Sequence, residues 1–417
     1  MQVIKRNKQK AEFQKEKIVK AILKAFIDVD NEETQYAKEK AREIATYIER
    51  LNKELSVEEI QDIVEEKLMA SNRKDVARAY VRYRYLRSLA RKEYNTLMDA
   101  IAEKLEASNI QNQNANIDEA SFGGRVGEAS NLVLQKFALD YCMSEKSKEN
   151  HLNNEIYIHD LNSYATGSHN CLTLPLDDLL KNGFNTRQTD VRPAQSINTA
   201  FQLVAVLMQL QSLMQFGGVA ASHLDWTMVP YVRKSFSKHM KDGLKYIENI
   251  DDEDYIDSVP TELEFNDREA NDLRHSKAYK YAMDMTTKEC YQAVEGMFHN
   301  LNTLQSRSGN QLPFSSINFG TCTLPEGRLV TKAILETCIK GIGKLHKTSI
   351  FPCLIFQVMK GVNKEKGTPN YDLYRLALKS TSLRLYPNYA NVDWSGNKGY
   401  DRSDPKTYFS TINKTVA

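Results

Sequence analysis

Residues 154–161, together with the short run that follows them, constrain the fold of this chain more than any other feature. Their isoleucines recur at every second position and the segment closes on His159 and Asp160, which predicts a buried strand with a polar end. The run Ser168–Cys171, which follows, ends in a cysteine. Barrel and α/β enzymes place their chemistry at strand ends. Spacing alone does not decide the role of Cys171. It is either a core residue, which is the commoner case, or an active-site thiol.

The composition indicates a folded protein with a large core. The chain has 417 residues, a net charge of +2, 41% hydrophobic residues and 26% charged residues, which predicts two or three domains, or one small and one large domain. The near-neutral charge argues against direct nucleic-acid binding as the main role. The N-terminus lacks the apolar core of a signal peptide, and the most apolar stretch, 203–210, is too short to span a bilayer. We therefore expect a cytoplasmic protein.

Six cysteines are scattered along the chain without a C-x-x-C pair. This spacing favours reduced thiols over a disulfide framework or a zinc ribbon, and we assign no residue to a metal site. Four of the cysteines are interpreted as packing residues, namely Cys142, Cys290, Cys338 and Cys353. Cys322 follows a predicted strand, where a catalytic thiol would also fit.

The first ninety residues have the pattern of a small, α-rich unit. Residues 3–6 predict a short strand with a basic end, and the apolar positions of residues 16–26 recur at helical spacing. The sequence Ser56-Val-Glu-Glu59 matches the capping box that begins a helix, and a further helix is predicted through residues 75–84. We place the end of this domain near residue 92.

The middle of the chain is predicted to be mainly helical. A polar loop is expected at 108–121, and the glycines within 123–127 are interpreted as a turn that leads into a helix. Residues 196–215 are apolar on most faces, which predicts burial in a core or in an oligomer interface. Residues 231–247 form a basic helix, and the acidic stretch 249–276 is interpreted as an inserted surface segment.

The last third alternates between strands and helices. Residues 305–320 predict a loop followed by a strand, 328–335 a helix, and 349–358 a buried strand that contains Pro352 near its start. Another helix is expected between Gly367 and Pro387. This alternation favours an α/β fold.

Several motifs, in this order, resemble the anaerobic (class III) ribonucleotide reductases. The motifs are IYIHDLNSYATGSHNC at 156–171, Q-x-P-F-x-x-x-x-F-G at 311–320, I-F-P-x-L-x-F at 350–356, G-x-P-N-Y-D at 367–372 and R-x-Y-P at 384–387. At the N-terminus, the order VIKR, EKIVKAI, SVEEIQDIVEEKL and DVARAYVRYR resembles the ATP-cone, a regulatory nucleotide-binding domain. The resemblance covers residues 1–410, least clearly in the acidic stretch, and the family has no cysteine at the position of Cys322.

The resemblance implies an ATP-cone at 1–92 and, at 93–417, the N-terminal part of a ten-stranded α/β barrel of the glycyl-radical enzyme type, with long dimer-interface helices. Cys171 matches the thiol that faces the thiyl cysteine in the family, and Asn170 is a candidate to hold substrate or the reductant formate. Clustered cations suit a triphosphate, and the candidates for ATP or dATP are Lys5, Arg6, Lys10 and Lys17. The candidate effector contacts at the dimer helices are Gln209, Lys234 and Lys238.

The family resemblance also sets expectations about partners and about what the chain lacks. The substrates would be ribonucleoside triphosphates, the activator a radical S-adenosylmethionine enzyme, and the assembly a homodimer built on the helix at 196–215. Family members carry a Met-Gly-Cys-Arg loop with the thiyl cysteine, then a four-cysteine zinc site and a glycyl-radical loop. This sequence contains none of the three. We therefore expect the chain alone to be inactive, so that a separate C-terminal reductase fragment would have to complement it.

Two alternatives remain at this stage. One is a non-catalytic regulator that binds ATP or dATP and retains the dimer helices. The other is a different glycyl-radical enzyme, such as a pyruvate formate-lyase relative. The second alternative is disfavoured because that family uses adjacent cysteines, no Cys-Cys pair occurs in this sequence, and an ATP-cone would be unexplained.

Overall fold

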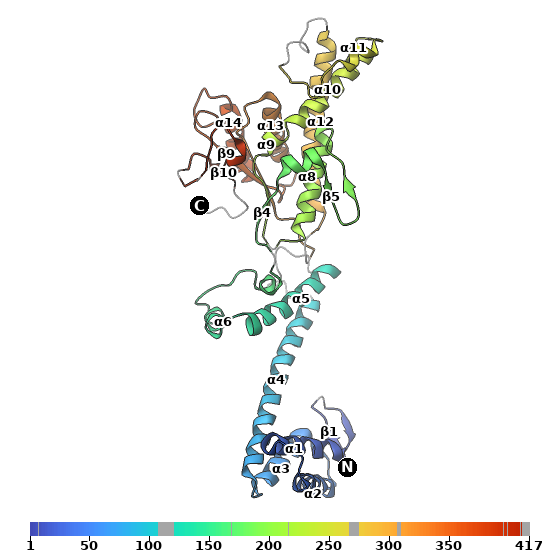
Figure 1. Cartoon of the computed structure of the whole chain (residues 1–417), viewed down its shortest axis with the longest axis vertical. Helices are drawn as coiled ribbons and strands as arrows, with labels where there is room; N and C mark the ends of the chain where they lie inside the picture. Colours follow the sequence, from blue (N-terminus) through green and yellow to red (C-terminus); the bar gives the residue numbers. More distant parts are fainter. Residues whose placement is uncertain are drawn as a thin grey trace. The chain divides into compact units, whose positions relative to one another are not determined.

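The computed structural model describes residues 1–410 apart from 7, 107–120, 168, 216, 267–274, 307–309, 395, 398 and 409. Its contacts divide the chain into two units, residues 1–102 and 103–417, which can be followed by colour along the chain in Figure 1. Almost all of the loop expected at 108–121 lies outside the described residues.

The N-terminal unit packs helices against a small sheet. Its elements are β1 (Gln2–Ile4), β2 (Lys10–Glu12), α1 (Lys15–Asp30), α2 (Gln35–Arg50), β3 (Leu55–Ser56), α3 (Val57–Met69) and α4 (Lys74–Glu106). Strand β1 lies between β2, which is antiparallel to it, and β3, which is parallel. Ile22 and Phe26 of α1 are fully buried in the core of the unit, as their helical spacing predicts.

The capping box at the start of α3 is confirmed. The Ser56 hydroxyl accepts a hydrogen bond from the N–H of Glu59 at 3.2 Å, and the Glu59 carboxylate accepts one from the N–H of Ser56 at 2.7 Å. The first N–H groups of a helix have no partner within the helix, so these two bonds determine where α3 begins.

Helix α4 runs without a break from Lys74 to Glu106. The position near residue 92 where we placed the domain boundary therefore lies inside a helix, and the contacts divide the chain after Ala102. Val76 and Tyr80 pack in the core of the N-terminal unit. From Tyr85 onward most side chains of α4 are exposed.

The C-terminal unit opens with short helices. They are α5 (Phe122–Phe137), the π-helical turn η2 (Ala138–Cys142), α6 (Glu145–Leu152) and the 3-10 helix η3 (Leu161–Thr166). The turn predicted at the glycines is wrong, because Ser121 caps α5 by accepting from the N–H of Gly124 at 3.0 Å. A Cβ on Gly123 would lie 2.5 Å from Oδ1 of Asn310, so this glycine allows close packing of the helix start.

The strand predicted at 154–161 is also wrong. Asn154 and Asp160 have φ angles of 60° and 51°, so the chain turns at both positions, and η3 begins directly afterwards. Ile156 and Tyr157 are 44% and 80% exposed. The alternation of isoleucines is a local pattern, and among the described residues no strand pairs with this segment.

A five-stranded parallel sheet forms the centre of the C-terminal unit. Its strands, in spatial order, are β10 (Asn388–Asn391), β9 (Cys353–Val358), β8 (Ser315–Phe319), β7 (Val219–Ala221) and β4 (Leu172–Thr173). Strands β8 and β9 confirm the two strands predicted in the last third. The α/β class is confirmed, and the five parallel strands are consistent with part of the ten-stranded barrel that the resemblance implies.

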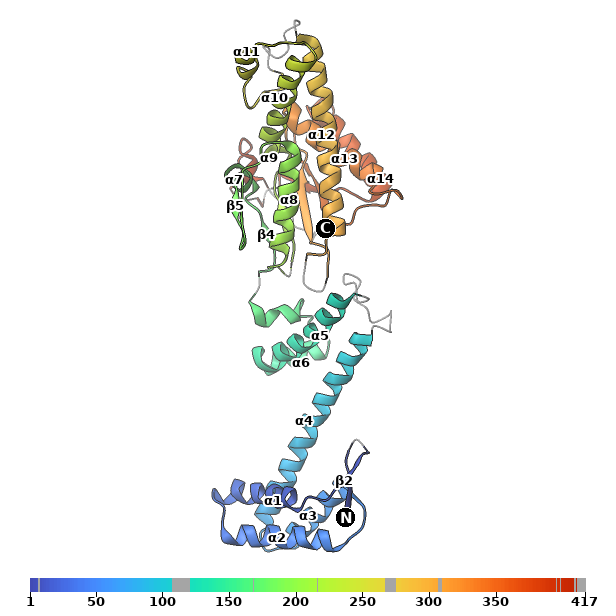
Figure 2. The ribbon, with the colours of Figure 1, turned by 90° about the vertical axis from the view of Figure 1, so that its right-hand side faces the viewer.

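Helices and a short hairpin make up the rest of the C-terminal unit. They are α7 (Leu176–Asn182), β5 (Phe184–Asn185), β6 (Asp190–Val191), α8 (Ile197–Ser212), α9 (Leu224–Thr227), α10 (Val229–Tyr246), α11 (Glu253–Asp257), α12 (Ser276–Thr303), α13 (Pro325–Lys340), α14 (Tyr371–Arg384) and η5 (Pro405–Thr407). Helices α8, α10 and α12 run side by side (Figure 2), and α13 packs against α12 and α14. Helices α8, α10 and α13 confirm the predicted helices.

Helix α8 buries its apolar faces within its own unit. Phe201, Val204 and Met208 are fully buried in a core cluster that includes residues of α10, α12 and β7. Core packing therefore accounts for the apolar sequence of α8, so that its apolarity gives no support to a dimer interface. Substitutions at Val204 or Leu207 would disturb this core rather than test an interface.

Two smaller interpretations also need correction. The acidic stretch 249–276 is not merely a surface insertion, because Leu263 and Phe265 are 3% and 4% exposed in the core. Of the cysteines assigned to packing, Cys142 is exposed, whereas Cys290 and Cys338 are buried. None of the described helices has the length and apolarity needed to cross a membrane.

Candidate functional site

Cys171 lies directly before β4, at the edge of the sheet where the parallel strands begin. The N–H of Leu172 donates to the carbonyl of Gly218 at 3.0 Å, which fixes the start of β4 beside β7. The Cys171 thiol donates to Oδ1 of Asn170 at 3.3 Å and accepts from the N–H of Gly218 at 3.4 Å. The cysteine is solvent-exposed, so this edge presents an accessible thiol beside an amide.

Gly217 makes this arrangement possible. A Cβ at Gly217 would lie 2.0 Å from the carbonyl oxygen of Asn170 and 2.5 Å from Sγ of Cys171. Any larger residue would displace the thiol or the backbone beside it. Asn170 and Cys171 are thus brought together as the sequence suggests, although the strand that positions them is β4 and not the segment 154–161.

A second cysteine begins another strand at the same edge. Cys353 starts β9, and its Sγ lies 3.3 Å from the hydroxyl of Tyr386. Strands β7 and β8 separate β4 from β9, and three strand spacings of about 4.8 Å amount to roughly 14 Å. Cys353 is therefore too far from Cys171 for the two thiols to meet.

The four cations assigned to nucleotide binding lie on or beside β1, β2 and α1 of the N-terminal unit, and all are exposed. Arg6 donates to Glu58 at 2.6 Å and to Gln61 at 3.3 Å. Lys10 forms an ion pair with Glu54 at 2.7 Å. Because carboxylates of the same unit already hold these two cations, a bound phosphate would have to replace those carboxylates.

Two further arginines, which no local sequence pattern marks, lie near Arg6. Arg84 of α4 lies 3.4 Å from Glu58. Burial alone would raise the pKa of the Glu58 carboxyl, but Arg6 and Arg84 outweigh it and the pKa is lowered. Burial, followed by the charge of Arg6, lowers the pKa of the Arg91 guanidinium. The fold therefore brings together three guanidinium groups from the β1–β2 turn and α4. Their separation in the sequence gives no sign of this cluster.

The three residues assigned to effector binding have different surroundings. Gln209 on α8 donates to the carbonyl of Asn300 at 3.3 Å. Lys234 on α10 donates to the carbonyl of Ala194 at 3.4 Å. Lys238, one turn further along α10, is exposed. Two of the three thus have backbone partners in their own unit.

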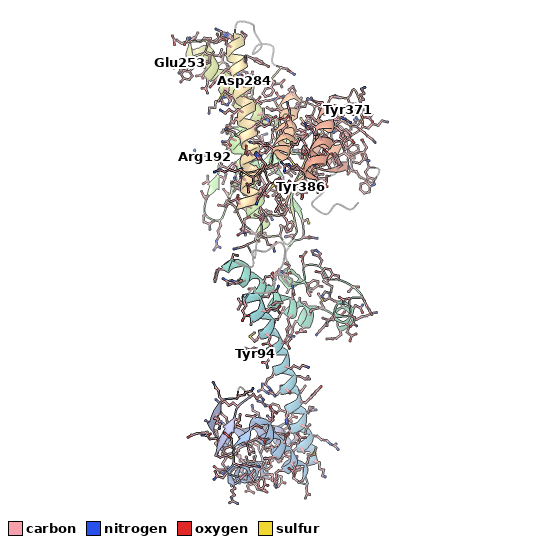
Figure 3. The ribbon with its side chains drawn as sticks, turned by 180° about the vertical axis from the view of Figure 1, so that it is seen from behind. Tyr94, Arg192, Glu253, Asp284, Tyr371 and Tyr386 are labelled. Carbon is pink, nitrogen blue, oxygen red and sulfur yellow. The ribbon has the colours of Figure 1, made fainter. Side chains whose placement is uncertain are left out.

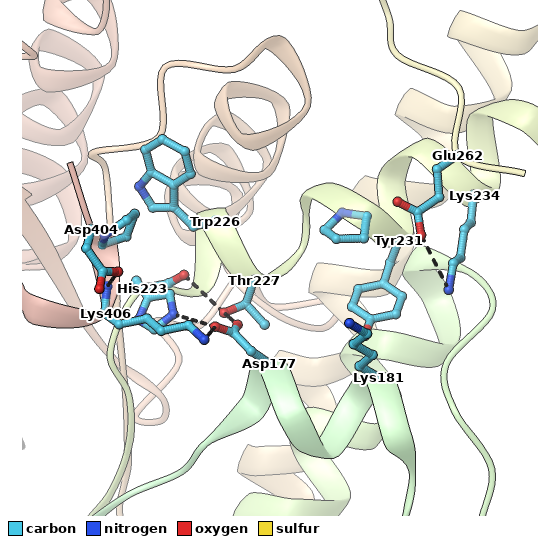
Figure 4. Close-up of a pocket in the computed structure, with 12 residues that line it drawn as sticks. Asp177, Lys181, His223, Trp226, Thr227, Tyr231, Lys234, Glu262, Asp404 and Lys406 are labelled. Carbon is cyan, nitrogen blue, oxygen red and sulfur yellow. Dashed lines mark hydrogen bonds and ion pairs between the residues drawn. The ribbon is translucent and has the colours of Figure 1, made fainter. Parts of the chain in front are cut away.

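A pocket of about 440 Å³ opens beyond the end of β7. Figure 4 shows its lining residues, which are Asp177, Lys181, His223, Trp226, Thr227, Pro230, Tyr231, Lys234, Glu262, Asp404, Pro405 and Lys406. Asp177 is its most connected group: its carboxylate lies 3.0 Å from Nε2 of His223, 2.6 Å from the hydroxyl of Thr227 and 3.6 Å from Nζ of Lys406. The pocket carries both signs of charge, so it does not select anions by charge alone.

Asp177 should make the protein sensitive to acid. Burial alone would raise the pKa of this carboxyl, but hydrogen bonds from His223 and Thr227 outweigh it and lower the pKa to about 2. An aspartate in an unfolded chain titrates near pH ~3.9. The stabilisation from Asp177 is therefore complete above about pH 4 and is lost as the pH falls through about 2, a difference of roughly 2–3 kcal/mol.

Denaturant unfolding at pH 7, 4 and 2.5 tests this expectation. The Asp177→Asn variant should be less stable than the wild type at pH 7, and this difference should shrink at the lowest pH. Asp178→Asn is the matched control, because Asp178 is exposed on the same helix. Equal pH dependence in the wild type and Asp177→Asn would contradict the assignment.

Two family models match the chain. The model described as anaerobic ribonucleoside-triphosphate reductase matches residues 113–408, more than half of the chain, and the ATP cone domain matches residues 1–89. The chain belongs to the anaerobic ribonucleoside-triphosphate reductase family. This result confirms the resemblance drawn from the motifs and the presence of an ATP-cone in the N-terminal unit.

Two curated members of this reductase family show how much of the family's length is present. The anaerobic ribonucleoside-triphosphate reductase of Haemophilus influenzae is 34% identical over 396 residues, which cover 94% of this chain and 52% of that protein. The reductase of Escherichia coli is 31% identical over 394 residues, with coverages of 94% and 51%. The chain thus spans about half the length of these curated relatives.

Solved structures include similar chains. One is the crystal structure of the anaerobic ribonucleotide reductase from Thermotoga maritima in complex with dATP and CTP. It aligns with a TM-score of 0.45 at 14% identity and covers 73% of this chain and 50% of that chain. No group of three or more potential metal-binding side chains occurs among the described residues.

Proposed function

We propose that this chain takes part in the anaerobic reduction of ribonucleoside triphosphates to deoxyribonucleotides. The observation that carries the proposal is the exposed Cys171 thiol beside Asn170 at the edge of the sheet, within the residues that match the reductase family. Removal of the ribose 2′ hydroxyl by radical chemistry needs two thiols that face each other and polar groups that guide the loss of water. Cys171 supplies one of the thiols, and Asn170 holds the substrate or formate through its amide.

Protection of Cys171 from alkylation tests this role directly. We expect a ribonucleoside triphosphate to slow the reaction of iodoacetamide with Cys171, because the bound substrate covers the thiol. Cys142 is the internal control, since it is exposed but lies outside the candidate site. Mass spectrometry of the digested protein measures both rates in one sample. Equal rates at Cys171 with and without nucleotide would contradict substrate binding at this edge.

We also propose that the N-terminal unit binds ATP or dATP as allosteric effectors through Lys5, Arg6, Lys10 and Lys17. The match to the ATP cone domain and the exposed cations on β1, β2 and α1 support this assignment. Lys5 and Lys8 lie in a tight turn between β1 and β2, where the N–H of Lys8 donates to the carbonyl of Lys5 at 2.8 Å. Phosphate oxygens are well suited to such a concentration of cations and exposed backbone.

Calorimetric titration of the full chain with ATP and with dATP measures this binding. At about 100 times its dissociation constant, the ligand should stabilise the N-terminal unit by ~2.7 kcal/mol. Arg6→Ala should weaken binding roughly tenfold or more, because a charge-assisted hydrogen bond contributes about 1.5–3 kcal/mol. Lys40→Ala is the control, since Lys40 pairs with Glu43 on α2. The absence of heat with both nucleotides would contradict the proposal.

The remaining family expectations are proposals of the same kind. They are a homodimer, effector contacts at Gln209, Lys234 and Lys238, and activation by a radical S-adenosylmethionine enzyme. For the dimer, the exposed Lys238 on α10 is a better probe than the buried Val204 of α8. Lys238→Glu should lower dimer formation without loss of secondary structure, and unchanged association would remove α10 from the interface.

The alternative is a regulator that binds ATP or dATP and carries out no chemistry. The exposed thiol at Cys171 favours the reductase, because a regulator has no use for an accessible cysteine packed against Gly217 and Gly218. The two functions differ in one experiment. A regulator would bind ATP at the N-terminal unit and leave the alkylation of Cys171 unaffected by ribonucleoside triphosphates.

A further inference from the structure

Ser222, His223 and Asp177 form a chain of hydrogen bonds at the carboxyl end of β7. The Ser222 hydroxyl lies 2.6 Å from Nδ1 of His223, and Nε2 of the same ring lies 3.0 Å from the Asp177 carboxylate. Ser222 directly follows β7, and Asp177 lies in the first turn of α7. A hydroxyl, an imidazole and a carboxylate thus meet in the order that activates a serine for nucleophilic attack.

The direction of these hydrogen bonds follows from the charge of Asp177. Burial alone would raise the pKa of its carboxyl, but hydrogen bonds from His223 and Thr227 outweigh it and lower the pKa to about 2. The group is therefore an anion at neutral pH, and a carboxylate can only accept hydrogen bonds. The hydrogen of the neutral imidazole must then lie on Nε2. Nδ1 carries the lone pair, so the Ser222 hydroxyl donates to a base.

Asp177 is itself held in place. The Thr227 hydroxyl donates to Oδ1 of Asp177 at 2.6 Å, and Nζ of Lys406 lies 3.6 Å from Oδ2 (Figure 4). A carboxylate fixed in this way determines which ring nitrogen of His223 carries the hydrogen and how the ring is turned. The nucleophile and its base are therefore oriented before any ligand binds.

The pocket of about 440 Å³ gives this chain of hydrogen bonds a place for a substrate. His223 and Asp177 line it, and Ser222 beside them is partly exposed. Apolar side chains form its walls, namely Trp226, Pro230 and Tyr231. A pocket of this volume holds a small organic molecule. Lys181 lines it as well, and its ammonium suits the negative charge that develops on the carbonyl oxygen of an ester under attack.

We propose that Ser222 is the nucleophile of a site that hydrolyses small carboxylic esters, with His223 as the base and Asp177 as the residue that orients the base. Oγ of Ser222 bonds to the carbonyl carbon, and the hydroxyl proton passes to Nδ1 of His223. The bond to the alcohol then breaks, and the alcohol leaves with that proton. Water, which gives a proton to the same nitrogen, attacks the acylated serine, releases the acid and restores the hydroxyl.

The proposed ester site is separate from the candidate reductase site. The Cys171 thiol contacts the N–H of Gly218 before β7 begins, whereas Ser222 follows the end of β7. The four residues from Gly218 to Ser222 span roughly 13 Å at ~3.3 Å per residue of strand. The ester hydrolysis therefore does not depend on the radical chemistry proposed for Cys171.

A fluorophosphonate probe tests the nucleophile in the full chain. Oγ of Ser222 attacks the phosphorus, fluoride leaves, and a stable ester of the probe remains on the serine. We expect mass spectrometry of the digested protein to find this adduct at Ser222 at least about a hundredfold faster than at Tyr371, because a general base contributes that much or more. Tyr371 is a suitable reference because it lies at the start of α14 (Figure 3) and does not line the pocket.

Substitutions separate the three roles. Ser222→Ala should abolish the adduct and the turnover of p-nitrophenyl acetate, and His223→Gln should slow both at least about a hundredfold. Asp177→Asn should also slow both, because its amide would donate to Nε2 and leave the imidazole hydrogen on Nδ1. Asp177→Glu keeps the carboxylate and should recover part of the rate. Asp178→Asn, on the exposed side of the same helix, should react like the wild type.

Circular dichroism establishes that each variant is folded. The proposal is overturned if the wild type forms no adduct at Ser222, or if His223→Gln forms it as fast as the wild type does. Hydrolysis of p-nitrophenyl acetate that persists in Ser222→Ala would also overturn it, because an imidazole would then act without the serine. Protection of Cys171 by ribonucleoside triphosphates is measured separately, so failure of one proposal leaves the other standing.

Discussion

Incubated under strict anaerobiosis with a ribonucleoside triphosphate, formate, an activating enzyme and S-adenosylmethionine, the purified chain is expected to form no deoxyribonucleotide. The proposed chemistry needs a second thiol that faces Cys171. Cys353, the other cysteine at this edge of the sheet, is separated from Cys171 by two strands and pairs with Tyr386. The sequence contains no Met-Gly-Cys-Arg loop, so the family's thiyl cysteine cannot come from these 417 residues.

The anaerobic ribonucleoside-triphosphate reductase of Escherichia coli, assayed in parallel, is the positive control for the reagents. Chromatographic separation of ribonucleotide and deoxyribonucleotide measures the product. If a complementing C-terminal fragment is added and activity appears, Cys171→Ala should abolish it and Cys142→Ala should not. Product formed by the chain alone would contradict the expected inactivity, because another of these 417 residues would then have to supply the second thiol.

Replacement of Asp225 by alanine is expected to destabilise the C-terminal unit severely. Its carboxylate is fully buried and accepts hydrogen bonds from the N–H groups of Gly320 at 2.8 Å and Cys322 at 2.9 Å. These bonds hold the loop after β8 against the start of α9. Alanine would leave both donors buried without a partner, and each such donor costs about 1–3 kcal/mol. A loss of roughly 3–5 kcal/mol is therefore expected.

Denaturant unfolding of the C-terminal unit, followed through Trp226 and Trp394, measures the effect. Asp225→Asn should cost less than Asp225→Ala, because the amide oxygen still accepts a hydrogen bond and the buried charge disappears. Burial raises the pKa of the Asp225 carboxyl above its ordinary value, while the N–H donors oppose this shift. Asp257→Ala on the exposed α11 is the control. Equal stability of Asp225→Ala and the wild type would show that the loop does not depend on this carboxylate.

Elements with strong local signals could be predicted from the sequence. The capping box at Ser56 involves only groups within four residues of one another, so it can be predicted without knowing the rest of the fold. Strand β9 is an apolar run interrupted only by Gln357. Strand β8 contains Ser315, Ser316 and Asn318, and all five of its residues are buried. Helix α2 was missed because its buried face is built largely from alanines, including Ala37, Ala41 and Ala45, which give a weak apolar pattern.

Other elements depend on partners that are distant in the sequence. Strand β4 has two residues and β7 has three, so neither shows periodicity, and each exists through pairing within the sheet. The strand expected at 154–161 does not form, because an alternating sequence needs a neighbouring strand to pair with, and none of the described strands pairs with this segment. Helix α8 was recognised as buried, but the sequence could not distinguish a core from a dimer interface.

In the candidate site, too, some features are local in the sequence and others depend on distant partners. Cys171 and Asn170 are adjacent in the sequence, so a motif could find both of them. The contact of the thiol with Gly218 and the exclusion of any side chain at Gly217 appear only once β7 lies beside β4. Asp177 and His223 pair at 3.0 Å across 46 positions of sequence, and no local pattern connects them.

The exposure of Cys171 has a consequence for samples handled in air. An accessible thiol is oxidised first to a sulfenic acid or a disulfide, both of which a reducing agent reverses, and then to sulfinic acid, which it does not reverse. Cys290, Cys322 and Cys338 are shielded by burial, so oxygen should consume the thiols at Cys171 and Cys142 before these three. Aerobic storage would then inactivate the candidate site while the fold stays intact, and a well-folded preparation could still lack the group on which its chemistry depends.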